Sequence, residues 1–226
     1  MTHVRVRQGA HLLGEVLITL GIVALLFAVY LVAWTNVRSH AEAAALTGDL
    51  RREWADAPHS TAGATGPTAT PAPVVPVPGK PFAIMTIPRL GRTWSSPVLE
   101  AAHQNISLDE LAQGVVHYKG TAMPGQVGNF AVAGHRATHG QPFADLDQVR
   151  KGDLVIVETE DAVYTYVVDE NPIIVLPTAL WVIDPVPGQT SVQPTKALIT
   201  LTTCNPRWNS SHRLIVFGHL QSTRAK

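Results

Sequence analysis

Residues 197–218 read Ala-Leu-Ile-Thr-Leu-Thr-Thr-Cys-Asn-Pro-Arg-Trp-Asn-Ser-Ser-His-Arg-Leu-Ile-Val-Phe-Gly. A run rich in β-branched residues ends at Cys204, a polar loop follows, and a second apolar run begins at Arg213. Two apolar runs separated by a polar turn segment are typical of a β-hairpin. Because the residue that leaves one antiparallel strand lies near the residue that enters the next, we expect the Cys204 thiol and the Arg213 guanidinium to lie close together.

Short β-rich runs separated by turn residues fill the chain from residue 80 onward. The expected strands are 82–87, 115–118, 129–134, 153–158, 163–168, 173–176, 197–203 and 213–220. Residues 109–112 and 145–149 favour short helical pieces between them. About eight strands at this spacing predict an all-β barrel or sandwich.

The N-terminal part of the chain has a different composition. Residues 16–34 carry no charged side chain, and a helix of that length crosses most of a hydrocarbon core of roughly 30 Å. We therefore predict a transmembrane helix at 12–36 and a cytoplasmic tail at 1–11. A cleaved signal peptide is the rival interpretation, but its apolar core is usually shorter and no small-residue cleavage site follows. Arg5 and Arg7 in the short tail favour an N-terminus inside the cell and the remainder outside.

Residues 37–79 are expected to form a stalk and a linker. The Ala, Glu, Leu and Arg content of 37–57 favours a helix, solvated or partly disordered, and the Pro/Ala/Thr-rich stretch 58–79 cannot build a core. Residues 80–226 then form the folded domain. The balance of 17 basic and 17 acidic residues gives no electrostatic case for nucleic acid. Neither a Gly-rich phosphate loop nor a recognisable metal-ligand spacing is present, so we expect no nucleotide, metal or other cofactor.

The chain has a single cysteine, so no intramolecular disulfide can form. A nucleophilic thiol needs a proton acceptor, and His135 is the best placed of the ten histidines, since it closes the apolar run 129–134 and opens a polar loop. His139 lies in the same loop and is the alternative base or a substrate contact. A lone cysteine is more often a small buried hydrophobe, and a lone histidine is more often structural. The joint occurrence of Cys204, His135 and Arg213 at strand ends favours catalysis.

These motifs resemble a known family. The segments that carry the resemblance are Thr-Leu-Thr-Thr-Cys at 200–204, Ala-Gly-His-Arg at 133–136, and Arg213. They are similar to the sortases, the membrane-anchored cysteine transpeptidases of Gram-positive bacteria. Residues 118–130 and 140–146 look most similar to the class E sortases of actinobacteria. The resemblance covers 82–220 and implies an eight-stranded sortase barrel as the catalytic domain.

The resemblance also implies a reaction. Cys204 would be the nucleophile, His135 the general acid/base, and Arg213 the group that binds substrate and stabilises the oxyanion; Thr203 would line the pocket, and His139 would contact substrate. Sortases cleave a C-terminal Leu-Ala-x-Thr-Gly or Leu-Pro-x-Thr-Gly signal of exported proteins after Thr. They form a thioacyl enzyme and transfer the acyl group to an amine of a peptidoglycan precursor, lipid II. The alternatives are a pilin-polymerising sortase, a cysteine hydrolase, and a catalytically silent membrane-tethered β-barrel that binds peptides.

Overall fold

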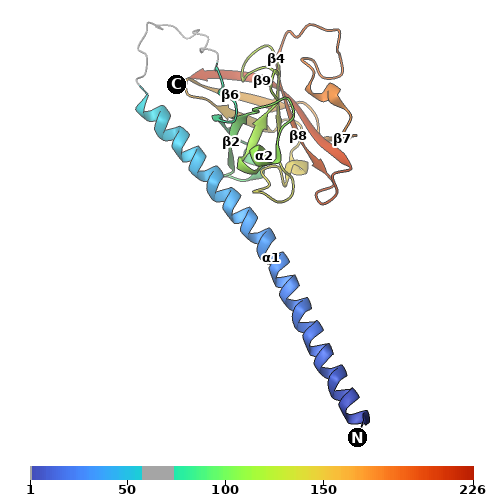
Figure 1. The fold of residues 1–226 in the computed structure, drawn as a ribbon. Coiled ribbons are helices and arrows are strands. Elements are labelled where there is room, and N and C mark those ends of the chain that lie inside the picture. The colour runs from blue at the N-terminus through green and yellow to red at the C-terminus, as the bar shows by residue number, and fades with distance from the viewer. Residues whose placement is uncertain (1, 58–73) are drawn as a thin grey trace.

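The computed structural model describes residues 2–57 and 74–226. Its first element is one long helix, α1 (Thr2–Asp56), and a β-sheet domain follows. Figure 1 shows that the N-terminal half of α1 projects away from this domain, whereas its C-terminal half lies along the outside of the sheet. The helix predicted at 37–57 is therefore present as the second half of α1. Most of the predicted linker, residues 58–73, lies outside the described residues.

Within the described residues, one sheet contains all the named strands. They are β1 (Pro81–Thr86), β2 (Ser95–Glu100), β3 (Val115–His117), β4 (Gly128–Ala133), β5 (Leu154–Glu158), β6 (Ala162–Val168), β7 (Ile173–Val175), β8 (Ala197–Asn205) and β9 (His212–Ala225). The strand order is β6-β5-β1-β2-β3-β4-β8-β9-β7. An additional pairing between β6 and β9 closes eight of these strands into a barrel, which confirms the expected fold class.

The barrel has the predicted number of strands but not the predicted set. Strand β2 was not predicted, yet it pairs antiparallel with β1 and parallel with β3. Pro97 weakens the strand signal of this segment, since proline cannot donate to a sheet ladder, although residues 96–100 are all buried. Conversely, the run predicted at 173–176 is not a barrel strand, because β7 only extends the sheet beside the beginning of β9.

The barrel interior holds the main hydrophobic core. Strand β6 alternates buried and half-buried residues along its whole length, as a strand with one face on a core should. Phe130, Tyr166 and Leu201 are fully buried in this core. Phe143 and Leu146, which follow β4 in the chain, are fully buried as well, so the core anchors the loop after β4.

In the described part of the chain, four short helices connect the strands. They are η1 (Pro88–Leu90), α2 (Leu108–Gln113), η2 (Leu146–Gln148) and η3 (Leu180–Ile183). Helix α2 and the 3-10 helix η2 occur where helical pieces were predicted. The N-terminus of α2 is fixed by a capping box, in which the Glu110 N–H donates to the Ser107 hydroxyl and the Ser107 N–H donates to the Glu110 carboxylate.

The second half of α1 packs on the barrel. Leu50 and Trp54 are buried and form a small cluster with Ile84 of β1, and the Lys226 ammonium lies 4.3 Å from the centre of the Trp54 ring. Ser39 is also buried. This face of the helix is packed rather than solvated, so the expectation of a solvated stalk is wrong for it. Among the residues that the structure describes, no helix combines the length and the apolar character needed to cross a membrane.

Candidate active site

The β8–β9 hairpin brings Cys204 and Arg213 together. They are direct partners in the antiparallel register, as the hairpin pattern predicted. Cys204 is half-buried, and its thiol is free. The Arg213 guanidinium donates from Nη1 to the backbone carbonyls of Ser210, at 3.0 Å, and His212, at 2.9 Å. A permanently charged residue is thus paired, across the hairpin, with the only cysteine of the chain.

Strand β4 places His135 on the other side of Cys204. It runs parallel to β8, with Ala133 opposite Thr202. The ladder continues beyond β4, because the Gly134 N–H donates to the Thr202 carbonyl at 3.1 Å and the Thr203 hydroxyl donates to the Gly134 carbonyl at 2.7 Å. The next residue, His135, therefore lies at the level of Cys204 on the neighbouring strand.

The environment of His135 favours its neutral form. Burial lowers the pKa of the imidazole, and the nearby His139 lowers it further, whereas a hydrogen bond to the Leu108 backbone acts in the opposite direction. The His135 and His139 rings are stacked with centroids 5.3 Å apart. The His135 Nε2 atom is buried without a hydrogen-bond partner among the described residues. No internal hydrogen bond would therefore have to break before this nitrogen took up or released a proton.

Arg136 ties the loop that carries His135 to the strand that carries Cys204. Its guanidinium donates to the side-chain oxygen of Asn205, which follows Cys204, and pairs with Asp147 at 3.0 Å. Arg136 is itself buried. The two catalytic candidates thus sit on segments that a buried, charge-assisted contact joins.

Side chains from distant segments also fix residues 138–141. All of these residues have positive φ angles, a conformation that costs roughly 1–2 kcal/mol for each residue other than glycine. The Gly140 N–H donates to the Asn36 side chain of α1 at 3.3 Å, and Arg207 donates to the Gln141 side chain at 2.7 Å. The turn is therefore held from one side by α1 and from the other by the β8–β9 loop.

A small pocket opens beside Arg213, on the side of β7. We call it the Tyr118 pocket; it is lined by Tyr118, Val175, Leu176, Pro177, Ala179, Leu180, Val182, Ile183, Thr202, Arg213 and Ile215. Its volume of about 70 Å³ suits one side chain. The Thr202 hydroxyl donates to the Val132 carbonyl, so the Tyr118 phenol donates to Thr202 at 3.0 Å. Burial raises the pKa of Tyr118, whereas the hydrogen bond to Thr202 and the positive charge of Arg213 act in the opposite direction.

A sortase-domain family model matches residues 85–221, which include Cys204, His135 and Arg213. The chain belongs to the sortase family. Sortase SrtE1 of Streptomyces coelicolor is 36% identical over 95% of this chain, which spans 58% of the length of SrtE1. The solved structure of sortase E from Streptomyces avermitilis is 48% identical, with a TM-score of 0.58, over 66% of this chain and 93% of that one. The SrtA sortase of Actinomyces oris is 33% identical, with a TM-score of 0.62, over 70% and 88% of the two chains.

The expected similarity to class E sortases is therefore confirmed, and the sortase barrel carries the three candidate residues on adjacent strand ends. His139 contacts His135 rather than the Tyr118 pocket. Thr203 is buried and bonded to Gly134, whereas its neighbour Thr202 lines the pocket. Thr202 therefore lines the pocket in place of the predicted Thr203. Successive strand residues point to opposite sides of the sheet, so Thr202 lies on the same side as Cys204 and Thr203 on the other.

Two residues near the candidate site were given no role in the sequence analysis. Tyr118 was interpreted as the end of a strand, and no local signal marks it as part of a pocket. Arg136 belongs to the Ala-Gly-His-Arg motif at 133–136, but nothing in the sequence indicates that it bonds to Asn205. Neither contact could be derived from spacing, because Thr202 and Asn205 lie far along the chain.

Proposed function

We propose that this chain is a membrane-anchored cysteine transpeptidase. It cleaves a Leu-Ala-x-Thr-Gly or Leu-Pro-x-Thr-Gly sorting signal of exported proteins after Thr and transfers the acyl group to an amine of lipid II. The observation that supports the proposal is the register of three adjacent strands, in which Cys204 is the partner of Arg213 on β9 and lies level with His135, just beyond the end of β4.

The first half of the reaction is acylation. The Cys204 thiolate attacks the carbonyl carbon of the signal threonine, and negative charge develops on the carbonyl oxygen. The Arg213 guanidinium is positively charged at any working pH and stabilises that oxygen. The carbon–nitrogen bond then breaks, and His135 as imidazolium protonates the departing glycine amine.

The second half reverses the proton movement. Neutral His135 accepts a proton from the incoming amine, whose nitrogen attacks the thioacyl carbon, and Cys204 leaves as a thiolate. The unpartnered Nε2 atom of His135 suits both steps, since no internal hydrogen bond has to break first. The lowered pKa of His135 favours the neutral form that this second half requires.

The Tyr118 pocket suits a side chain of the sorting signal. Its wall from β7 and η3 is apolar, with Val175, Leu180 and Val182 among its residues. The Arg213 guanidinium and the Tyr118 phenol supply polar groups at its edge. An apolar signal residue bound there would leave the threonine carbonyl near Cys204.

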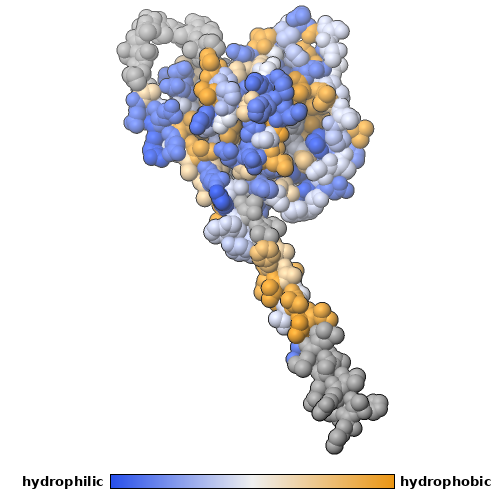
Figure 2. Space-filling view, in the orientation of Figure 1, coloured by the Kyte–Doolittle hydropathy of each residue, from blue (hydrophilic) through white to orange (hydrophobic). Residues whose placement is uncertain are grey.

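Residues 12–36 are proposed to anchor the chain in the cell membrane as a single span, with the N-terminus in the cytoplasm and the catalytic domain outside. Large apolar side chains on all sides of this part of α1 support the proposal, since each is more than half exposed: Val16, Leu17, Ile18, Leu20, Ile22, Val23, Leu25, Leu26, Phe27, Val29 and Tyr30. Figure 2 shows this apolar surface on the projecting helix, in contrast to the mixed surface of the domain.

Mass spectrometry of the full chain after incubation with a Leu-Ala-Glu-Thr-Gly peptide tests the function. We expect the mass of a Leu-Ala-Glu-Thr acyl group on Cys204 and release of free glycine. The Cys204→Ala variant should show neither product. A wild-type chain that never gains the acyl mass, although its thiol reacts with iodoacetamide, would refute the proposal.

A further inference from the structure

A second cavity lies between α1 and the barrel. It has a volume of about 380 Å³, within the usual range of ligand sites. Its walls come from α1, from the segment before β2, from the loop after His135 and from Arg207 of the β8–β9 loop. We call it the α1 cavity; it shares no lining residue with the Tyr118 pocket.

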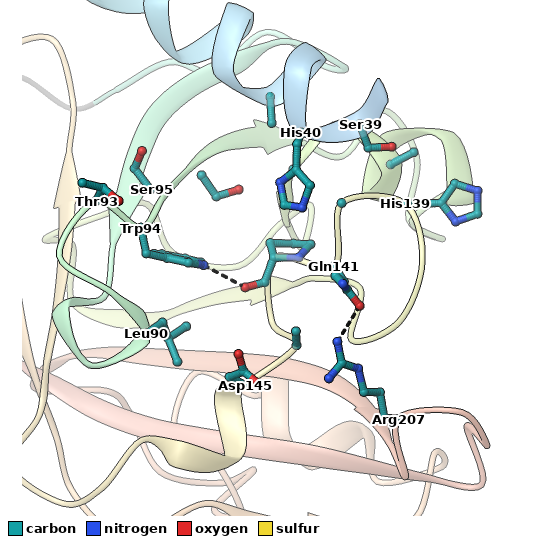
Figure 3. A pocket seen from close by; sticks show the side chains of 17 residues that line it. Ser39, His40, Leu90, Thr93, Trp94, Ser95, His139, Gln141, Asp145 and Arg207 are labelled. Carbon is teal, nitrogen blue, oxygen red and sulfur yellow. Dashed lines mark hydrogen bonds between the residues drawn. The ribbon is translucent and has the colours of Figure 1, made fainter. Parts of the chain in front are cut away.

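Two walls of the α1 cavity are attached to the catalytic candidates. His139, which contributes to the wall, stacks on His135. Arg207 follows Cys204 in the β8–β9 loop, and its guanidinium bonds to Gln141 across the gap between the two loops (Figure 3). The cavity therefore borders the segments that carry the general base and the nucleophile.

The polar groups of the α1 cavity have complementary charges. The Nε atom of Arg207 is buried without a hydrogen-bond partner among the described residues, and an unpaired buried N–H is costly unless an acceptor oxygen binds it. The exposed carboxylate of Asp145 lines the same cavity and can bind an ammonium group. Figure 3 shows His40 pointing from α1 toward the space between Trp94 and Gln141.

A transpeptidase needs a place for its second substrate, since water hydrolyses a thioacyl enzyme that binds no acceptor. We propose that the α1 cavity binds the acceptor, a peptide with a primary amine and a nearby carboxylate or carboxamide, and that α1 forms one wall of this site. Asp145 attracts the amine and Arg207 binds the carboxyl oxygen. The bound ammonium group first releases one proton to solvent. The neutral amine nitrogen then attacks the thioacyl carbon and loses a second proton to His135 as the amide bond forms, while the carbon–sulfur bond breaks and Cys204 leaves as a thiolate. This inference rests on the proposed function.

The ratio of transfer to hydrolysis tests the site separately from acylation. The full chain in detergent micelles is acylated with the Leu-Ala-Glu-Thr-Gly peptide and then divided between L-lysine and 1,5-diaminopentane, an amine without a carboxylate. Ala43→Phe fills the cavity from α1. Ala44→Phe is the matched control, because Ala44 is exposed on the same helix and does not line the cavity.

We expect Ala43→Phe to lower the ratio of lysine amide to free acid by about tenfold or more, with the rate of acylation within about twofold of wild type and Ala44→Phe unchanged. Arg207→Met should lower transfer to lysine about tenfold more than transfer to 1,5-diaminopentane, the loss of one charge-assisted hydrogen bond to the carboxylate. Any change caused by the lost contact with Gln141 should affect both amines equally. Equal ratios in wild type, Ala43→Phe and Arg207→Met would overturn the acceptor site. Failure of the wild type to acylate would instead refute the proposed function.

Discussion

The two sides of Cys204 are built differently. On the strand side, backbone ladders fix the positions of Arg213 and His135, through the β8–β9 and β4–β8 pairings. On the loop side, side chains from distant segments fix the turn 138–141 and the β8–β9 loop, through contacts such as Arg207 to Gln141. A ladder consists of many weak bonds, so one substitution on the strand side should change chemistry without changing the fold. A loop held by a few contacts should lose both its geometry and its stability when one contact is removed.

The largest expected effect tests the strand side. Arg213→Ala should lower kcat/KM for peptide cleavage by about 10²- to 10³-fold, the usual effect of removing one oxyanion-stabilising group. The Tm should stay near the wild-type value, because the guanidinium bonds carbonyls of its own loop. Arg224→Ala, at an exposed position of the same strand, is the control for charge. Cleavage within tenfold of wild type would remove Arg213 from the mechanism.

The second prediction tests the loop side. Arg136→Met should lower the free energy of unfolding by about 2–3 kcal/mol, since charge-assisted hydrogen bonds from a buried group are lost. Most of this loss should come from Asn205, because the Asp147 side chain is 54% exposed and such a pair contributes little. Urea denaturation measures the free energy of unfolding. Asp147→Asn is the matched control, in which we expect a smaller decrease in that free energy. An Arg136→Met variant as stable as wild type contradicts the assignment of the loop side to a few side-chain contacts.

The same contrast explains what the sequence could predict. The positions of Cys204 and Arg213 followed from strand-end spacing, because a hairpin joins neighbours in the chain. The number of apolar runs predicted a barrel or a sandwich, and the resemblance to sortases implied the eight-stranded barrel that the structure shows. Strand β2 was not predicted, because Pro97 weakens the strand signal in its sequence. The segment forms a strand because it is buried and pairs with both β1 and β3.

Contacts between distant segments leave no local pattern in the sequence from which they could be predicted. The packing of α1 on the barrel depends on Leu50 and Trp54, which nothing in the composition of the predicted stalk distinguishes from their neighbours. The position of Tyr118 depends on Thr202, and the choice of Thr202 over Thr203 for the pocket wall depends on the phase of β8. One residue of error in that phase moves a side chain to the other side of the sheet.

The third prediction concerns Gly134, which lies where the strand side of the site meets the loop side. A methyl group on Gly134 would lie 2.6 Å from the ring of Phe143, which is fully buried and stacks on Trp94. Gly134→Ala should therefore lower the free energy of unfolding by about 1–2 kcal/mol through overpacking and slow acylation by shifting His135. The double variant Gly134→Ala/Phe143→Leu should recover part of the acylation rate. Gly48→Ala, in the open on α1, should not destabilise the chain. A fully active and stable Gly134→Ala chain would show that the loop moves freely against the core.

The smallest expected effect separates the loop contact of His139 from the chemistry of His135. Burial lowers the pKa of His135, and the charge of His139 lowers it further. In His139→Gln the pKa of His135 should rise, so the decline of single-turnover acylation at high pH, which follows loss of the His135 proton, should begin at a higher pH. The same shift has a consequence for stability. A histidine whose pKa is lowered by folding contributes stability above its ordinary pKa of about 6.5, and that contribution is lost as the pH falls through the native value.

His139→Gln should therefore lose less stability on acidification than the wild type, while the part of the loss that burial causes remains. Thermal unfolding at several pH values between about 4 and 8 measures this difference, in the range where histidines titrate. His219→Gln is the control, because His219 pairs with Asp169 on a different part of the barrel. Coincident acylation profiles for wild type and His139→Gln would show that the stacked ring holds the loop without influencing the proton on His135. In that case the loop side of Cys204 would act through geometry alone.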